Sequence, residues 1–122
     1  MNLPTILLII FLVTLLGFTV YKKQKLSLTT KKKLVILGAA IVLVVASLLI
    51  SQTRIAGTIE STTYGWPHSF LHYAIKDIID NKTINQWSFE TRAFLYILAN
   101  YLFYLSFVFL FVVLLRSYRK NK

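Results

Sequence analysis

The chain of 122 residues is too apolar, and its charge too unevenly distributed, for an ordinary soluble domain. Hydrophobic residues make up 57% of it, charged residues only 15%, and the charges are confined to three short stretches. This segregation is typical of a membrane protein. The length leaves no room for a separate soluble domain of usual size. Because cysteine is absent, disulfides, thiolate metal sites and thiol catalysis are excluded.

The net charge of +10 comes from two basic stretches that contain no acidic residue. One lies between the first two apolar runs, and the other follows the last run. All four acidic residues fall in the central polar region, where four basic residues balance them. This distribution predicts membrane topology and contacts with anionic lipid headgroups rather than nucleic-acid binding. The expected headgroup contacts are Lys22, Lys23, Lys31, Lys32, Lys33, Arg116, Arg119 and Lys120.

Three apolar runs predict three membrane spans, at residues 3–21, 34–51 and 94–115. The first run covers about 28 Å at the helical rise, close to one hydrocarbon thickness. Asn2 is expected to cap it. Its basic residues follow the apolar stretch, which indicates a retained helix rather than a signal peptide. Ser88 is expected to cap a helix that leads into the third span.

The two basic stretches determine the expected orientation. Their lysine and arginine bias places the link 22–33 and the tail 116–122 in the cytoplasm. The N-terminus and the loop 52–93 are then outside. We therefore predict an all-α fold: a single membrane domain built as a three-helix bundle, with its N-terminus out, its C-terminus in, and a short amphipathic helix in the outer loop.

The outer loop is rich in aromatic residues, which predicts an ordered segment rather than a flexible linker. A turn around Gly65 and Pro67 is expected to precede a helix over residues 68–80, whose apolar positions recur at helical spacing and which Asn81 would end. This helix could lie on the outer leaflet, cap the bundle or contact a partner. The candidate binding surface is Tyr64, Trp66, Pro67, His68, Phe70, His72, Tyr73 and Trp87.

His68 and His72 are four residues apart and would share a face of the expected helix, a spacing at which two histidines can bind one metal ion. We expect a structural role for this pair, with no metal and no other cofactor. Tyr96, Asn100 and Tyr104, also spaced by four, form a polar line on the third span. Because a polar group in hydrocarbon needs a partner, this line is expected to face the other spans, where Thr14 and Ser47 are available, or another subunit. A polar cavity for a headgroup or substrate is the functional alternative.

The segment Tyr64-Gly65-Trp66-Pro67, followed by Phe70 and Tyr73, resembles a pattern in small multi-span bacterial membrane proteins. In these, a Gly-aromatic-Pro turn precedes a short aromatic segment, and the last span opens near an Asn and aromatics, as residues 100–104 do here. The resemblance covers about a third of the chain. It implies a bacterial plasma membrane and no particular activity.

Three functions remain open. The first is a non-enzymatic accessory protein that acts through helix packing and its aromatic outer loop on lipid, a larger membrane complex or another copy of itself. The second is a pore-former resembling phage holins, which share this orientation and a basic tail but usually have brief loops. The third is a small membrane enzyme that uses His68, His72 and loop carboxylates on a lipid-linked substrate. The spans contain no charged interior residue, which argues against a transporter.

Overall fold

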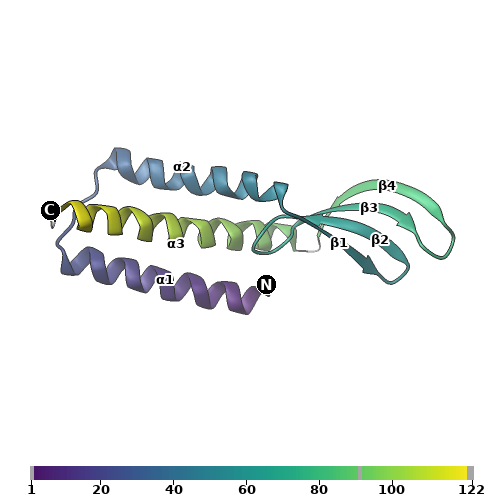
Figure 1. The fold of residues 1–122 in the computed structure, drawn as a ribbon, viewed down its shortest axis with the longest axis horizontal. Helices are drawn as coiled ribbons and strands as arrows, with labels where there is room; N and C mark the ends of the chain where they lie inside the picture. The colour runs from purple at the N-terminus through teal and green to yellow at the C-terminus, as the bar shows by residue number, and fades with distance from the viewer. Residues whose placement is uncertain (1, 91, 121–122) are drawn as a thin grey trace.

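A computed structural model of the chain describes residues 2–90 and 92–120. Three helices lie side by side, and a curved sheet projects from one end of them (Figure 1). The chain runs through two helices, then through all of the strands, and ends in the third helix. The N-terminus lies at the sheet end, whereas the helix α3 carries the C-terminus to the opposite end (Figure 1).

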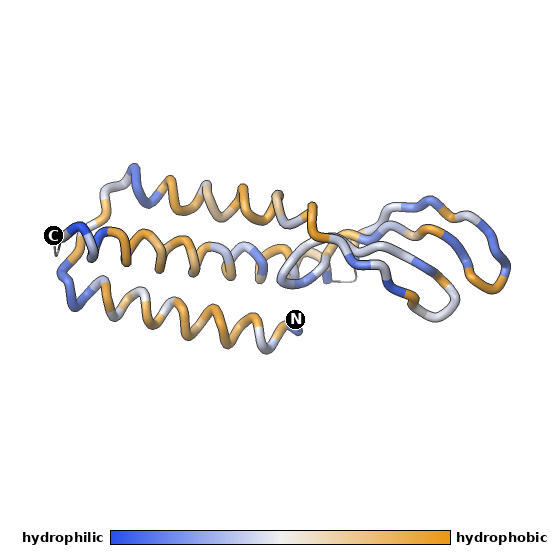
Figure 2. Tube along the Cα trace, viewed as in Figure 1, coloured by the Kyte–Doolittle hydropathy of each residue, from blue (hydrophilic) through white to orange (hydrophobic). Residues whose placement is uncertain are grey.

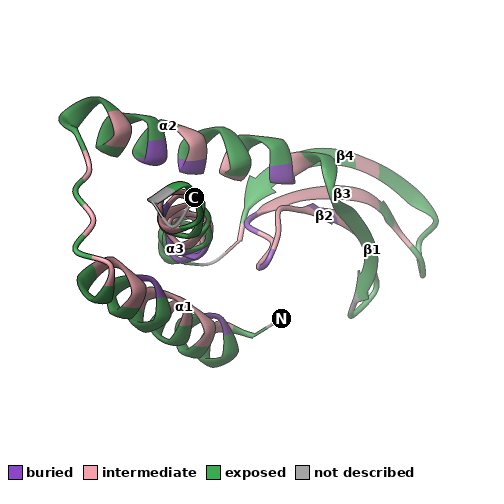
Figure 3. Cartoon of the chain, turned by 60° about the vertical axis from the view of Figure 1, so that its left-hand side comes forward, coloured by how far each residue is buried: buried purple, intermediate pink, exposed green. Residues whose placement is uncertain are grey.

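The helices are α1 (Leu3–Lys23), α2 (Thr30–Ala46) and α3 (Ala93–Lys120), and a 3-10 turn, η1 (Ser47–Leu49), extends α2. All three are long and apolar enough to cross a membrane. Figure 2 shows the apolar residues along them, and Figure 3 shows that most of their outward positions are exposed. Exposed apolar helix surfaces of this kind are expected of spans that contact lipid.

The starts of α1 and α2 follow ordinary capping chemistry. The Asn2 side chain accepts a hydrogen bond from the Thr5 amide at 3.0 Å, so the predicted cap is confirmed. Thr29 accepts from the Lys32 amide at 3.3 Å and caps α2 in the same way. The second helix therefore begins four residues before the predicted boundary, inside the lysine-rich link, because a cap and not the hydropathy decides where it starts.

The expected all-α fold class is wrong, because the protein is α+β. Between α2 and α3 the chain forms one four-stranded antiparallel sheet in which each strand pairs with its neighbour in sequence. The strands are β1 (Ser51–Ala56), β2 (Ile59–Tyr64), β3 (Leu71–Asp77) and β4 (Lys82–Phe89). The segments are rich in Thr, Ile, Tyr and Trp, which favour strands.

The expected amphipathic helix over residues 68–80 does not exist, because most of it is strand β3. In isolation its apolar spacing fits a helix. Pairing on both sides overrides that spacing: β3 is a central strand, with Thr62 opposite Tyr73 on one side and Trp87 opposite Tyr73 on the other. In a central strand alternate residues bond to the neighbours on opposite sides, so the backbone groups on both sides are paired and the side chains pack against both neighbours.

Two other boundary predictions are corrected by the same sheet. Asn81, the expected helix terminator, does adopt a left-handed conformation (φ 52°), but in the β3–β4 turn. The turn is held by the Asp77 carboxylate, which accepts from the Ile79 amide at 3.1 Å. Ser88 is a residue of β4 rather than a helix cap, because α3 begins at Ala93.

The core runs along α3, which lies between α1 and α2 (Figure 3). At the sheet end it is built from Ile6, Ala99 and Phe103, which are all buried. Further along, Gly17 of α1 is buried against the Phe109 ring of α3, and a Cβ at Gly17 would lie 2.8 Å from that ring. Glycine therefore permits the close approach of these two helices.

Replacing Gly17 by leucine is expected to lower the free energy of unfolding by about 1–3 kcal/mol, because the added side chain overpacks the contact with Phe109. Gly38 provides the matched control, since a Cβ there meets no atom within 4 Å. Unfolding of both variants is measured by titrating the protein in mild detergent with SDS. Equal stability of G17L and G38L would contradict the close α1–α3 contact.

Candidate functional site

The segment 65–70 between β2 and β3, here called the docking loop, folds back on itself at the foot of the sheet. Gly65 has a φ of 114°, and a Cβ there would lie 2.7 Å from the Phe70 ring. Phe70 is buried, and its amide donates to the Tyr64 carbonyl at 3.0 Å. Both the backbone conformation and the space thus require glycine at residue 65. The fold brings residues 66–68 against α3.

Asn100 of α3 holds the docking loop through two hydrogen bonds to one residue. Its amide nitrogen donates to the His68 carbonyl at 2.7 Å, and its amide oxygen accepts from the His68 backbone amide at 3.2 Å. Asn100 is fully buried. An asparagine side chain presents one donor edge and one acceptor edge, so it can take the place of a neighbouring backbone segment for His68. The loop has no strand partner at this point, and Asn100 supplies the missing pair.

Tyr104, one helical turn further along, binds the preceding part of the docking loop. Its hydroxyl donates to the Trp66 carbonyl at 2.5 Å. The Trp66 ring packs edge-on against Phe103, with 5.3 Å between ring centroids, and joins the core around Ile6. This cluster links α1, α3 and the docking loop at a single level.

Tyr96, at the sheet end of the same line, stacks on the His68 ring. The ring centroids are 3.7 Å apart and the planes differ by 13°. The three predicted residues of the polar line therefore act together, and all of them contact the docking loop. Asn100 bonds to the loop backbone rather than to Thr14 or another side chain of the other two spans.

The two histidines do not share a site. His68 lies against Tyr96, and its Nδ1 lies 2.8 Å from the Ser69 carbonyl oxygen. His72 lies in β3, with its Nδ1 3.6 Å from a carboxylate oxygen of Glu90. Within residues 2–90 and 92–120, His, Asp and Glu side chains form no group of three or more that could hold a metal ion.

One face of the sheet carries an exposed aromatic cluster, here called the aromatic face, formed by Tyr64, Tyr73, Trp87 and Phe89. Tyr73 and Trp87 are paired across β3 and β4, with 4.6 Å between ring centroids, and Tyr64 lies 5.6 Å from Trp87. The Tyr73 hydroxyl donates to the Asn85 side chain at 2.9 Å. Trp87 is 58% exposed and Phe89 67% exposed. The outer part of the aromatic face is thus uncovered, whereas Tyr64 and Tyr73 are half-buried.

The predicted binding residues fall into two groups. Trp66, Pro67, His68 and Phe70 are part of the docking loop, where their contacts are internal. Tyr64, Tyr73 and Trp87 form the aromatic face, and His72 lies in the same strand as Tyr73. Sequence reasoning missed Phe89, although Asn85, Trp87 and Phe89 alternate along β4 as one face of a strand does.

The basic residues gather at the other end of the helices. Lys25, Arg116 and Arg119 line a cleft beside the α1–α2 link. Arg116 donates to the Ser27 carbonyl at 3.1 Å, which ties the end of α3 to that link. Lys22 and Lys23 form the last turn of α1, and residues 31–33 lie in the first turn of α2. The side chain of Lys120 lies outside the described part of the chain.

No protein-family model matches the sequence, and neither curated proteins nor solved structures provide a match.

Tyr104→Phe is expected to lower the free energy of unfolding by about 1 kcal/mol, because it removes one hydrogen bond and leaves the Trp66 carbonyl without that donor. Tyr101→Phe is the matched control on the same helix, at a residue that lines an apolar cleft between α2 and α3. SDS titration in mild detergent gives both values. An equal effect of the two variants would contradict a specific role for Tyr104.

Proposed function

We propose that this chain is a non-enzymatic accessory protein of a bacterial plasma membrane, which presents its aromatic face to a partner membrane protein. In this proposal the three helices span the bilayer, the basic end lies in the cytoplasm, and the sheet stands outside. The orientation is supported by the positive-inside bias of the two acid-free stretches, which lie together at the end of the helices opposite the sheet.

The observation that carries the proposal is a contrast between the two groups of aromatic residues. The docking loop is bound to α3 by the Asn100 and Tyr104 hydrogen bonds, so the sheet is held firmly on the membrane domain. The aromatic face beyond it is organised by stacking, yet Trp87 and Phe89 are mostly exposed. A rigid support with uncovered aromatic side chains is favourable for binding, because little conformational entropy is lost on association.

The residue types of the aromatic face also fit recognition. Trp and Tyr are enriched among the residues that dominate binding energies at protein interfaces. Contact with lipid headgroups is the alternative use of such residues, since Trp and Tyr also gather at membrane–water interfaces. A protein partner is favoured because the rings are paired across neighbouring strands and the Tyr73 hydroxyl is bonded within the sheet, to Asn85.

The titratable groups of the sheet support a binding role over catalysis. His72 pairs with Glu90 at 3.6 Å, and Lys76 pairs with Glu60 at the same distance, in both cases with partly exposed side chains. Glu60 and Glu90 thus each lie beside a basic side chain on the sheet surface. Partly exposed pairs of this kind contribute little to stability.

A photo-crosslinking amino acid at position 87, introduced in cells that make the protein at its normal level, is expected to give one discrete adduct with another membrane protein. Position 86 is the matched control, because Gln86 neighbours Trp87 in β4 and points to the opposite face. Trp87→Ala should shift the complex in native gels to the size of the free protein, whereas Gln86→Ala should not. Adducts with lipid alone from position 87, or equal adducts from both positions, would contradict the proposal.

A further inference from the structure

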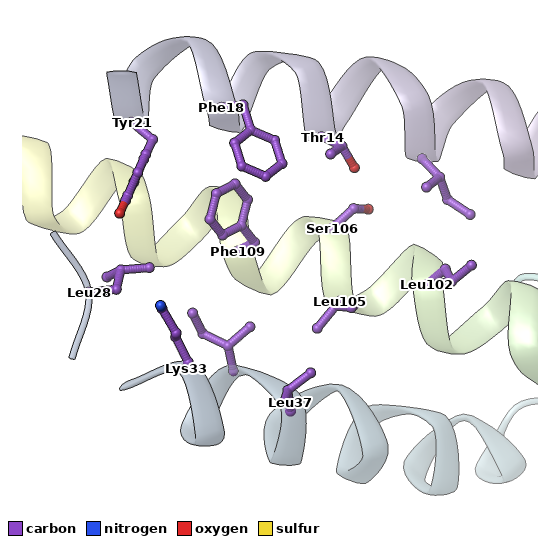
Figure 4. A pocket seen from close by; sticks show the side chains of 12 residues that line it. Thr14, Phe18, Tyr21, Leu28, Lys33, Leu37, Leu102, Leu105, Ser106 and Phe109 are labelled. Carbon is purple, nitrogen blue, oxygen red and sulfur yellow. The ribbon is translucent and has the colours of Figure 1, made fainter. Parts of the chain in front are cut away.

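The helices leave a cavity between them in the half that lies away from the sheet. Its volume is about 610 Å³, within the range of about 300–1,000 Å³ usual for small-molecule sites. Apolar side chains of all three helices line it, among them Phe18, Leu37, Leu102 and Leu105 (Figure 4). The cavity is not fully enclosed, so a molecule in a bilayer could enter it sideways.

The end of this cavity that is remote from the sheet is positively charged. Lys33 is the one charged residue that lines it in the described part of the chain, and Figure 4 shows its amine directed into the space beside Leu28. Thr14 and Ser106 are the hydroxyl-bearing residues deeper inside, whereas the remaining wall is mostly apolar. The cavity is therefore amphipathic along its length: charged at the membrane surface and apolar in the hydrocarbon region.

A basic cleft of about 380 Å³ adjoins this charged end. The two spaces are separated only by the α1–α2 link, since Ser27 lines the cleft and Leu28 lines the cavity. Arg116 is fixed against the link by its hydrogen bond to the Ser27 carbonyl at 3.1 Å. No Asp or Glu side chain occurs before residue 60 or after residue 90, so these cations lack an acidic side chain to neutralise them.

We infer that the cavity binds an anionic phospholipid, with an acyl chain between the helices and the phosphate at Lys33 and the basic cleft. Charge complementarity favours this occupant, because a lipid supplies the anion that the chain does not. A free phosphate would leave the apolar cavity uncovered. The site lies at the opposite end of the helices from the aromatic face. A finding that no lipid binds here would therefore leave the proposed function unaffected.

The first test titrates purified protein in mild detergent with phosphatidylglycerol or phosphatidylcholine and counts retained lipids by native mass spectrometry. The wild type is expected to retain one phosphatidylglycerol in preference to phosphatidylcholine. Lys33→Gln should weaken retention about fivefold, as expected for one basic residue near an anionic headgroup. Lys31→Gln is the matched control, because Lys31 lies on the same helix, is exposed and does not line the cavity.

The second test fills the apolar part of the cavity with a larger side chain. Leu105→Trp should reduce retention at least fivefold, whereas Leu114→Trp, at an exposed position of the same helix, should not. Leu102→Trp repeats the test, and circular dichroism checks that each variant remains helical. Four outcomes would overturn the inference: equal retention of both lipids, equal effects of Lys33→Gln and Lys31→Gln, displacement of the lipid by millimolar inorganic phosphate, or retention unchanged by both tryptophans that line the cavity.

Discussion

The structure depends on one buried amide. Asn100 lies in α3 about 10 Å from the start of the helix and is fully buried, where an unpaired polar group is costly. It satisfies both edges of its side chain on the backbone of His68. Because the two bonds act on a single residue, the loop cannot slide along the helix without losing both. The register between the sheet and the membrane domain follows from this pair.

The rest of the sheet end is arranged around that pair. Trp66 packs between α1 and α3, and the Tyr104 hydroxyl donates to the Trp66 carbonyl. The Phe70 ring packs against Gly65. The β2–β3 connection is therefore part of the membrane domain as much as of the sheet. The sheet is held through its central connection, and Trp87 and Phe89 of its outer strand β4 are left exposed. At the opposite end the helices line an amphipathic cavity, which lies beside a basic cleft.

The helical part of the fold could be predicted from the sequence because a span leaves a long and unbroken apolar run. The strands could not, because a strand carries its pattern in only a few residues and needs its partners to be stable. Residues 68–80 illustrate the difficulty, since Phe70, Ile75 and Ile78 fit a helical stripe equally well in isolation. Gly57, with a φ of 64° in the β1–β2 turn, and the Thr-rich segments beside it are the sequence features that indicate a hairpin here.

The residues of the candidate site could be predicted from the sequence, but the contacts between them could not. The need of Tyr96, Asn100 and Tyr104 for polar partners follows from their spacing in an apolar helix, and all three do contact polar or aromatic groups of the loop. The partners of Asn100 and Tyr104 are backbone groups, which have the same chemistry at every residue and leave no trace in the sequence. For this reason hydropathy points to the polar line but not to the loop that it holds.

The central claim is that Asn100 holds the sheet rigidly on the helices, and a distance measurement tests it directly. Because the chain contains no cysteine, spin labels can be placed at Asp80→Cys, in the turn at the tip of the sheet, and Ile41→Cys, exposed on α2. Electron–electron double resonance in nanodiscs should give one narrow distance distribution, which Asn100→Leu broadens while the helices stay folded. A broad distribution in the parent protein, or a narrow one that Asn100→Leu leaves unchanged, would contradict the claim.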